Sequence, residues 1–214
     1  MWKLYPVLPA LALTIAACDR SPPPPEAWLG PVTVVTTPAA PGSRYPHLAA
    51  VPDGGAVMSW LQPIPDGRFA LQHARWGEDS WAPPAMVATG TDWFINWADF
   101  PSVVPVTDHV WAAHWLQQKP GNVYSYDVRM AVSADAGATW SAPMSPHDDG
   151  TPTEHGFVSL YGVGGELRAA WLDGRHTSGE HDHAAGGHGA MTLRGATIGT
   201  DGRRVGLDQE IDAR

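Results

Sequence analysis

A segment of about 55 residues recurs three times along the chain, and this repeat limits the possible fold more than any other feature. A tryptophan marks the same place in each copy, 15 positions after residues 45, 100 and 156, at Trp60, Trp115 and Trp171. The spacings between these tryptophans are 55 and 56 residues. A fixed period near 50 with several short strands per copy is typical of a β-propeller, in which each copy forms one small sheet, or blade.

Each copy is expected to contain four strands. In the first copy these are residues 45–51, 56–62 and 69–76 and a fourth strand from residue 81 onward, with turns at 52–55 and 77–80. The 23 glycines and 21 prolines suit many short strands and turns better than long helices. A β-sandwich has a similar alternation of apolar and polar residues, but the equal spacing of the copies favours the propeller.

The turn after the third strand of the second copy carries a motif. Residues Ser133–Trp140 follow the pattern S-x-D-x-G-x-T-W, in which Asp can hydrogen-bond its own backbone and Gly accepts a positive φ. This motif resembles the Asp-box of sialidase-like β-propellers, and residues 77–80 and 199–202 hold degenerate versions of it. The resemblance implies an all-β fold of the six-bladed sialidase-like type. About three four-stranded blades fit into residues 43–214, so we expect the N-terminal half of such a propeller.

The resemblance also names two candidate catalytic residues. Arg44-Tyr45-Pro46 resembles the R-I-P motif of sialidases, whose arginine grips a substrate carboxylate through its guanidinium fork. Asp66 lies 22 residues later, near the place of the family's acid/base aspartate. The alternatives are a solvated arginine and an ordinary Pro-Asp-Gly turn. The family's Tyr and Glu pair comes from later blades, so catalysis by this chain alone is not expected.

Hairpin topology brings further polar residues to the face that holds Arg44. The start of the first strand and the end of the second lie at the same end of an antiparallel hairpin, away from the Asp-box turns. Asp173 and Arg175 either reach a ligand on this face or pair with each other. Trp93 either stacks on a sugar ring or fills the space between two blades. The ligand-binding candidates are Asp99, His155, Asp173, Arg175 and Trp93.

The loop over residues 175–189 is rich in histidine. It contains His181, Asp182 and His183 in sequence, followed by His188. Imidazole and carboxylate groups can bind Zn²⁺, so weak zinc binding through His181, His183 and His188 is one hypothesis for this loop. A solvated low-complexity insertion is the alternative, because a Gly- and Ala-rich loop is not preorganised. No other cofactor is expected.

The N-terminal residues have the pattern of a lipoprotein signal. Residues 1–17 form a signal peptide with a short apolar run, and Ile15-Ala16-Ala17-Cys18 resembles a bacterial lipobox that leaves Cys18 lipidated. Residues 18–42 form a tether with four consecutive prolines. We therefore expect a lipid anchor in the bacterial cell envelope, facing the periplasm or the surface, with the choice between inner and outer membrane left open.

The function predicted from these features is binding or hydrolysis of a glycan or a small acidic ligand by a sialidase-like lipoprotein. The formal net charge of −9 argues against a nucleic-acid partner. Two alternatives remain at this point, which are a non-enzymatic binding or assembly platform and a metal-binding periplasmic protein. Besides the membrane, a second half-propeller or another chain is a candidate partner.

Overall fold

The computed structural model describes residues 30–121, 123–177 and 190–212, and the strands in these ranges make an all-β fold. The chain divides into two compact units, Met1–Val35 and Thr36–Arg214, and all the strands belong to the second. The first sheet holds β1 (Arg44–Ala50), β2 (Ala56–Ile64), β3 (Arg68–Trp76) and β4 (Ala85–Gly90). The second holds β5 (Ser102–Pro105), β6 (Trp111–Gln118) and β7 (Tyr126–Ser133). The third holds β8 (His155–Val163), β9 (Glu166–Asp173), β10 (Thr192–Ile198) and β11 (Arg204–Asp212).

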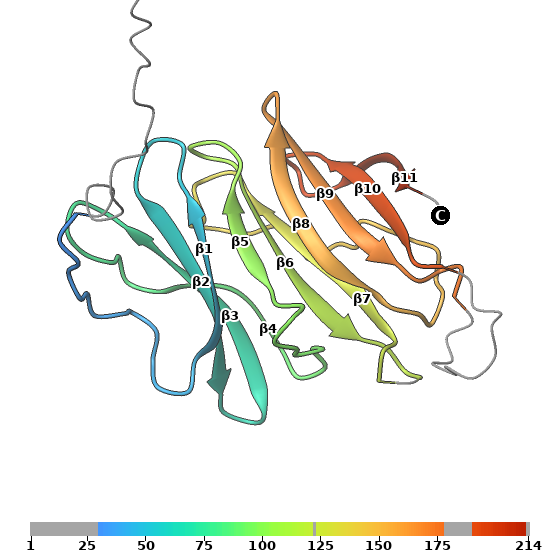
Figure 1. The fold of residues 1–214 in the computed structure, drawn as a ribbon, viewed down its shortest axis with the longest axis horizontal. Helices are drawn as coiled ribbons and strands as arrows, with labels where there is room; N and C mark the ends of the chain where they lie inside the picture. Colours follow the sequence, from blue (N-terminus) through green and yellow to red (C-terminus); the bar gives the residue numbers. More distant parts are fainter. Residues whose placement is uncertain (1–29, 122, 178–189, 213–214) are drawn as a thin grey trace, which may run out of the picture. The chain divides into compact units, whose positions relative to one another are not determined.

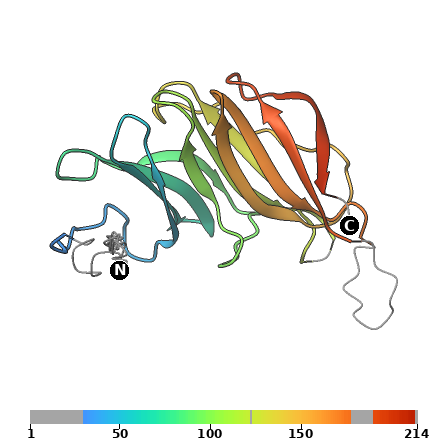
Figure 2. The same cartoon turned by 45° about the horizontal axis from the view of Figure 1, so that its top comes forward.

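Each sheet is an antiparallel meander whose strands pair in chain order. The three sheets follow one another within the second unit, as the colours in Figures 1 and 2 show. Strand β5 contacts β1 and β2, and β8 contacts β6 and β7, so the first strand of a sheet packs against the sheet before it. The all-β class predicted from the repeat is therefore confirmed, with one sheet for each copy.

The prediction of four strands is confirmed for the first and third copies and was wrong for the second, which has three, and the fourth strand of the first copy starts later than expected. Strand β4 begins at Ala85, because Trp81 forms only an isolated bridge with Trp76 before Pro83 and Pro84 interrupt the pairing. In the second sheet, a single Met130–Met144 bridge stands where a fourth strand was expected. The segment after the Asp-box contains two prolines, at 143 and 146, which have no N–H to donate to a neighbouring strand.

The hydrophobic core lies between the sheets in two clusters. Alternate residues of β6 face opposite ways: Trp111 and Trp115 pack in the cluster with the first sheet, and Leu116 packs in the cluster with the third. The repeat tryptophan of the third sheet, Trp171, is fully buried against the second sheet. Large aromatic side chains contribute the most buried apolar area per residue, which explains why the repeat keeps a tryptophan at this position.

The Asp-box turn is held together by its own side chains and packs on the first sheet. The Gly137 N–H donates to Ser133 Oγ at 2.8 Å, and Thr139 Oγ1 donates to Asp135 Oδ2 at 2.6 Å. Hydrogen bonds from the Thr139 hydroxyl and amide lower the pKa of Asp135 to about 2. On β3 of the first sheet, His73 Nε2 donates to the Gly137 carbonyl at 3.2 Å. The motif therefore joins two sheets.

Candidate functional site

A groove of about 330 Å³ opens between β5 and β8, and we call it the Asp99 groove. The second copy of the repeat supplies Asp99, Phe100, Ser102 and His114 to its lining. Residues 157–160 of β8 form the other side, and His47 of β1 also contributes. The groove therefore lies where the first strands of all three sheets come together.

A β-bulge shapes the β8 side of the groove. The register with β9 shifts between Gly156 and Ser159, and Phe157 between them has a φ of 52°. Such a bulge redirects side chains at a strand's end, and the Phe157 ring is 48% exposed. A Cβ on Gly156 would lie 2.0 Å from Asp99 Oδ2, so only glycine leaves room for this carboxyl group.

Three acidic groups meet at one end of the groove. The Tyr126 hydroxyl donates to Glu154 Oε1 at 2.6 Å and lies 3.4 Å from Asp99 Oδ2. Burial raises the pKa of Asp99 to about 6, although hydrogen bonds from the Phe157 amide and Tyr126 act in the opposite direction. Burial and the hydrogen bond to Glu154 raise the pKa of Tyr126 well above its usual value. Tyr126 therefore remains a protonated phenol that acts as a hydrogen-bond donor.

The two histidines that line the groove are neutral. Burial, together with nearby His47, lowers the pKa of His114 to about 3, and burial also lowers the pKa of His47. His114 Nδ1 lies 3.0 Å from Ser102 Oγ. A backbone hydrogen bond with Phe100 partly offsets the lowering of the His114 pKa, whereas His47 Nδ1 is buried without a hydrogen-bond partner within the described ranges. A buried polar atom of this kind calls for a ligand or a water molecule to satisfy it.

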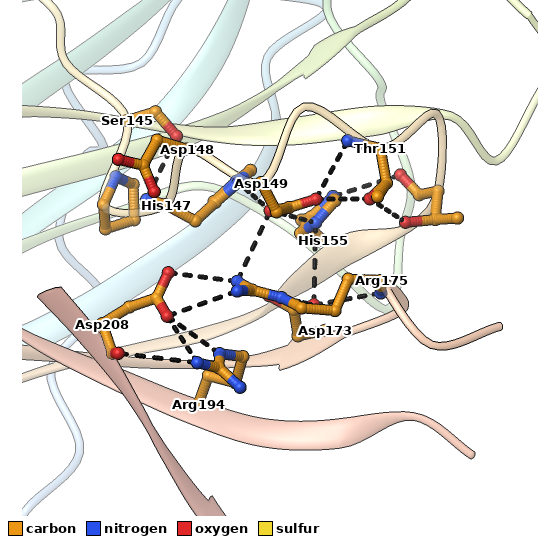
Figure 3. A network of polar contacts seen from close by, with 12 residues as sticks. Ser145, His147, Asp148, Asp149, Thr151, His155, Asp173, Arg175, Arg194 and Asp208 are labelled. Carbon is orange, nitrogen blue, oxygen red and sulfur yellow. Dashed lines mark hydrogen bonds and ion pairs between the residues drawn. The ribbon is translucent and has the colours of Figure 1, made fainter. Parts of the chain in front are cut away.

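A network of polar contacts lies next to the groove, where β8 begins and β9 ends (Figure 3). His147 Nδ1 and His155 Nε2 both donate to Asp149 Oδ2, each at 3.1 Å. His155 Nδ1 lies 3.2 Å from the Tyr126 carbonyl, an acceptor, so both of its ring nitrogens donate and the ring is an imidazolium. Burial lowers the pKa of His155, but the hydrogen bond and the charges of Asp149 and Asp173 outweigh it and raise this pKa.

The second histidine of the network is neutral and stacks on the first. His147 Nε2 accepts the Val128 N–H at 3.3 Å, so this nitrogen carries no proton. The His147 and His155 rings stack with centroids 4.0 Å apart and an angle of 7° between their planes. A neutral ring lying over an imidazolium shields the cation from water without repelling it.

Arg175 joins the carboxylates on the other side of the network. Its Nε and Nη2 donate to Asp173 at 2.8 Å each, and Nη2 also donates to Asp208 at 3.0 Å. Arg194 donates to the same Asp208 at 2.6 Å. Burial raises the pKa of Asp173, but hydrogen bonds from Arg175 and Trp171 outweigh it and lower this pKa. The contacts join the end of β9 and the start of β10 to the middle of β11.

Two groups of side chains in this network have metal-ligand composition, Asp127 with His147 and His155, and Asp149 with His155 and Asp173. The nitrogen and oxygen atoms that could bind a metal ion are better explained by hydrogen bonds within the network and by the guanidinium of Arg175. His155 uses both nitrogens as donors, and Arg175 Nη2 lies 3.4 Å from Asp149 and supplies the positive charge. The predicted zinc ligands His181, His183 and His188 lie outside the described residues, as do the lipidation site Cys18 and the signal peptide.

The candidate catalytic residues lie apart from the groove lining. Arg44 is exposed at the start of β1, with its guanidinium carbon 5.8 Å from the centre of the Phe69 ring. It lines a different cavity, of about 380 Å³, beside Trp60. Asp66 is exposed in the β2–β3 turn, where Asp66 and Gly67 have φ values of 65° and 67°. Two successive positive φ values are typical of a type I′ hairpin turn, which accounts for Asp66 without catalysis.

The ligand-binding candidates separate into three environments. Asp99 lines the groove, while His155, Asp173 and Arg175 belong to the buried network. Asp173 and Arg175 pair with each other, which is one of the two alternatives that the sequence left open. Trp93 packs in the cluster between the first and second sheets, with its ring centre 5.7 Å from that of Trp115, so it fills space between two sheets.

Sequence reasoning missed several residues of the site. Tyr126 and Glu154 lie 28 positions apart and meet through an isolated parallel bridge and through the hydrogen bond between their side chains. His147 and Asp149 belong to the segment Pro146-His147-Asp148-Asp149-Gly150, whose polar composition was the one available signal. His47 and His114 occupy strands and look like core residues in an alternating pattern.

Comparison with protein-family models gives no match for this chain, and comparison with curated proteins finds no significant match. Across the described ranges, no helix is long and apolar enough to cross a membrane.

Proposed function

We propose that this chain is a sialidase-like propeller lipoprotein that binds a glycan in the Asp99 groove. The observation that carries the proposal is the groove itself, which combines a buried carboxyl group, two neutral imidazoles and two partly exposed rings. Phe100 and Phe157 are 37% and 48% exposed beside it. A sugar ring has an apolar C–H face that packs on an aromatic side chain and hydroxyl groups that both donate and accept.

The polar groups of the groove are of the kind that hydrogen-bond to hydroxyl groups. Asp99 accepts when ionised, and its pKa of about 6 leaves it ionised at neutral pH. The buried His47 Nδ1, which has no partner within the described ranges, can donate or accept one hydrogen bond according to its tautomer. A cavity of about 330 Å³ is at the small end of the range for small-molecule sites and suits about one sugar ring.

The lining favours a neutral sugar over an acidic one. The described residues that line the groove include no lysine or arginine, and the formal net charge of the chain is −9. An anionic ligand would meet the Asp99 carboxylate without a compensating cation. We therefore narrow the expectation of a glycan or small acidic ligand to an uncharged glycan.

Binding is better supported than hydrolysis. A sialidase-type reaction uses a tyrosine nucleophile, and its activation requires a lowered pKa or access to a base. Tyr126 is 1% exposed, its pKa is raised, and its proton is held by Glu154. Arg44 and Asp66 lie outside the groove lining. In this proposal the lipid on Cys18 anchors the binding domain at the cell envelope, and the Asp-box stabilises the fold.

The experiment is ligand-observed NMR and calorimetry of the full chain with methyl glycosides of glucose, galactose and N-acetylglucosamine, and with N-acetylneuraminic acid. We expect saturable binding of at least one neutral glycoside, weakened roughly tenfold or more by Asp99→Ala because a hydrogen bond to a charged group is lost. Asp108→Asn, an exposed substitution in the β5–β6 turn, is the matched control and leaves binding unchanged. Absence of saturable binding to any neutral glycoside, or binding indifferent to Asp99→Ala, contradicts the proposal.

A fluorogenic sialoside separates binding from hydrolysis. We expect no cleavage by the full chain. Cleavage that is abolished by Arg44→Ala would instead support the enzymatic form of the function, with Arg44 in the role that the sequence resemblance gives it.

A further inference from the structure

The carboxyl group of Asp99 is a buried acid without an ion-pair partner. Asp99 lines the groove and is only 4% exposed. Across the described residues, it accepts hydrogen bonds from the Phe157 amide and the Tyr126 hydroxyl, but it forms no ion pair. Proteins normally pair a buried charge with an opposite one, because an isolated charge is costly to remove from water. The ionised form of Asp99 therefore lacks a balancing cation in the groove.

The groups next to Asp99 do not supply this positive charge. The Tyr126 hydroxyl links Asp99 to a second acid, Glu154. Burial raises the pKa of Asp99 most, and the charge of Glu154 raises it further. The lining histidines, His47 and His114, have lowered pKa values and are neutral at pH 7. The described residues that line the groove include no lysine or arginine.

The cations of the neighbouring network are paired with its own carboxylates. His155 Nε2 lies 3.1 Å from Asp149 Oδ2, and Arg175 Nε lies 2.8 Å from Asp173 Oδ1. Neither cation forms an ion pair with Asp99 in the described part of the chain. A cation that balances Asp99 is therefore best supplied by the ligand.

Two aromatic rings also favour a cation in the groove. Phe100 and Phe157 line it and are 37% and 48% exposed, and the face of an aromatic ring attracts a positive charge. We infer that the sugar bound in the groove carries an amino group, whose ammonium pairs with Asp99. This inference rests on the proposed function, which supplies the sugar ring, and adds one charged group to that ring. An ammonium donates up to three hydrogen bonds, so it can reach the carboxylate while the ring packs on a phenyl side chain.

Matched glycosides test the inference on the wild-type chain. The ligands are the methyl glycosides of glucose and galactose, the forms in which an amino group replaces one hydroxyl, and the N-acetylated forms of these amines. Calorimetry with the full chain is carried out at pH 7, where Asp99 is ionised because its pKa is about 6. We expect at least one amino form to bind about tenfold more tightly than its parent glycoside, because charge-assisted hydrogen bonds are the stronger ones. Acetylation removes the charge and should remove this gain.

Asp99→Asn identifies the group that recognises the amine. The amide keeps the size of the side chain and an acceptor oxygen but carries no charge. The ratio of the affinities for the amino form and its parent should therefore fall below about threefold, and this ratio cancels any general effect on glycan binding. Asp108→Asn is the matched control, because it removes an exposed charge in the β5–β6 turn and should keep the ratio. The wild-type ratio should also persist in about 0.5 M sodium chloride, since salt screens a buried pair less than exposed charges.

The outcomes separate the inference from the proposed function. Saturable binding of parent glycosides with no gain from an amino group overturns the inference and leaves the proposed function in place. A gain that Asp99→Asn preserves, or that salt abolishes, also overturns the inference, because the amine then responds to the net charge of the chain. Binding of an amino form without measurable binding of its parent supports the inference and contradicts only the restriction to an uncharged glycan. If neither amino nor parent glycosides bind, both proposals fail.

Discussion

Replacing Gly137 by alanine tests whether the Asp-box joins two sheets or only closes a turn. Gly137 has a φ of 84°, a region that a residue with a Cβ rarely adopts. A Cβ at this position would also lie 2.6 Å from Cε1 of His73 and 2.9 Å from Cε3 of Trp111. Both neighbours are buried, with exposed fractions of 5% and 1%, so they have little room to move.

The expected loss of stability has two parts. The left-handed backbone conformation costs about 1–2 kcal/mol for a residue with a Cβ. Forcing an extra methyl group into a packed core costs about 1–3 kcal/mol more, because His73 and Trp111 must leave their rotamers. The sum is about 2–5 kcal/mol. That is a large fraction of the stability of an ordinary domain, which is about 5–15 kcal/mol.

Gly164→Ala separates the two parts. Gly164 lies in the turn between β8 and β9 with a φ of 60°, and nothing lies within 4 Å of the position where its Cβ would be. This variant should therefore lose only the stability that the left-handed backbone costs, about 1–2 kcal/mol. The difference between the two variants reports the packing of the Asp-box against the first sheet.

Urea unfolding of the full chain, followed by tryptophan fluorescence, measures both variants under the same conditions. We expect Gly137→Ala to lower the midpoint clearly more than Gly164→Ala, with the same slope. Equal losses for the two glycines would refute the packing of the motif on His73 and leave it as an isolated turn. A loss confined to Gly164→Ala would contradict the contact distances themselves.

Two further predictions concern buried charges. Arg175→Leu removes the arginine that pairs with the Asp173 carboxylate, which is 0% exposed, whereas Asp208 keeps its ion pair with Arg194. This variant should lose about 3–5 kcal/mol of stability by thermal unfolding, because a buried charge is left without its guanidinium. Arg168→Leu removes only an exposed ion pair with Glu166 and should cost less than about 1 kcal/mol, so equal losses would contradict a buried network. The pKa of Asp99 in the folded chain, about 6, lies above its unfolded value of 3.8, so the wild type loses stability as the pH rises through this interval. Asp99→Asn does not titrate, so its stability relative to the wild type should increase by about 2–3 kcal/mol between pH 4 and pH 8. A stability difference between variant and wild type that stays constant over this pH range would contradict the raised pKa.

The repeat predicted the strands well because each strand is defined by local alternation. Strands β1, β2 and β3 begin and end within two residues of the ranges expected from the first copy. The fourth strands of the first two copies were the exception, because pairing at the edge of a sheet has one neighbour only and is easily interrupted by proline. Pro83, Pro84, Pro143 and Pro146 were visible in the sequence, and their effect on pairing explains the late start of β4 and the single bridge after the Asp-box.

The site was predicted only in part, because its contacts join residues distant in sequence. Hairpin topology correctly placed His155 and Asp173 at the same end of their sheet, since they are register partners in β8 and β9. Topology carries no information on burial, however, and both side chains are 0% exposed within an ionic network. The meeting of Tyr126 with Glu154 depends on how the third sheet packs on the second. No local pattern reports that packing.

Trp60 shows that the repeat predicts something about the surroundings of a residue as well as about the residue itself. As one of three equivalent tryptophans, it predicts a packed core position, and its exposed fraction of 1% agrees. Its neighbours differ, however, because residues 37–43 and not a sheet cover it, with a cavity of about 380 Å³ and an unpartnered indole N–H beside it. A repeat that keeps the same side chain at its first position keeps the need for the same partner surface. At Trp60 that surface is supplied by residues 37–43, which leave the side chain 1% exposed.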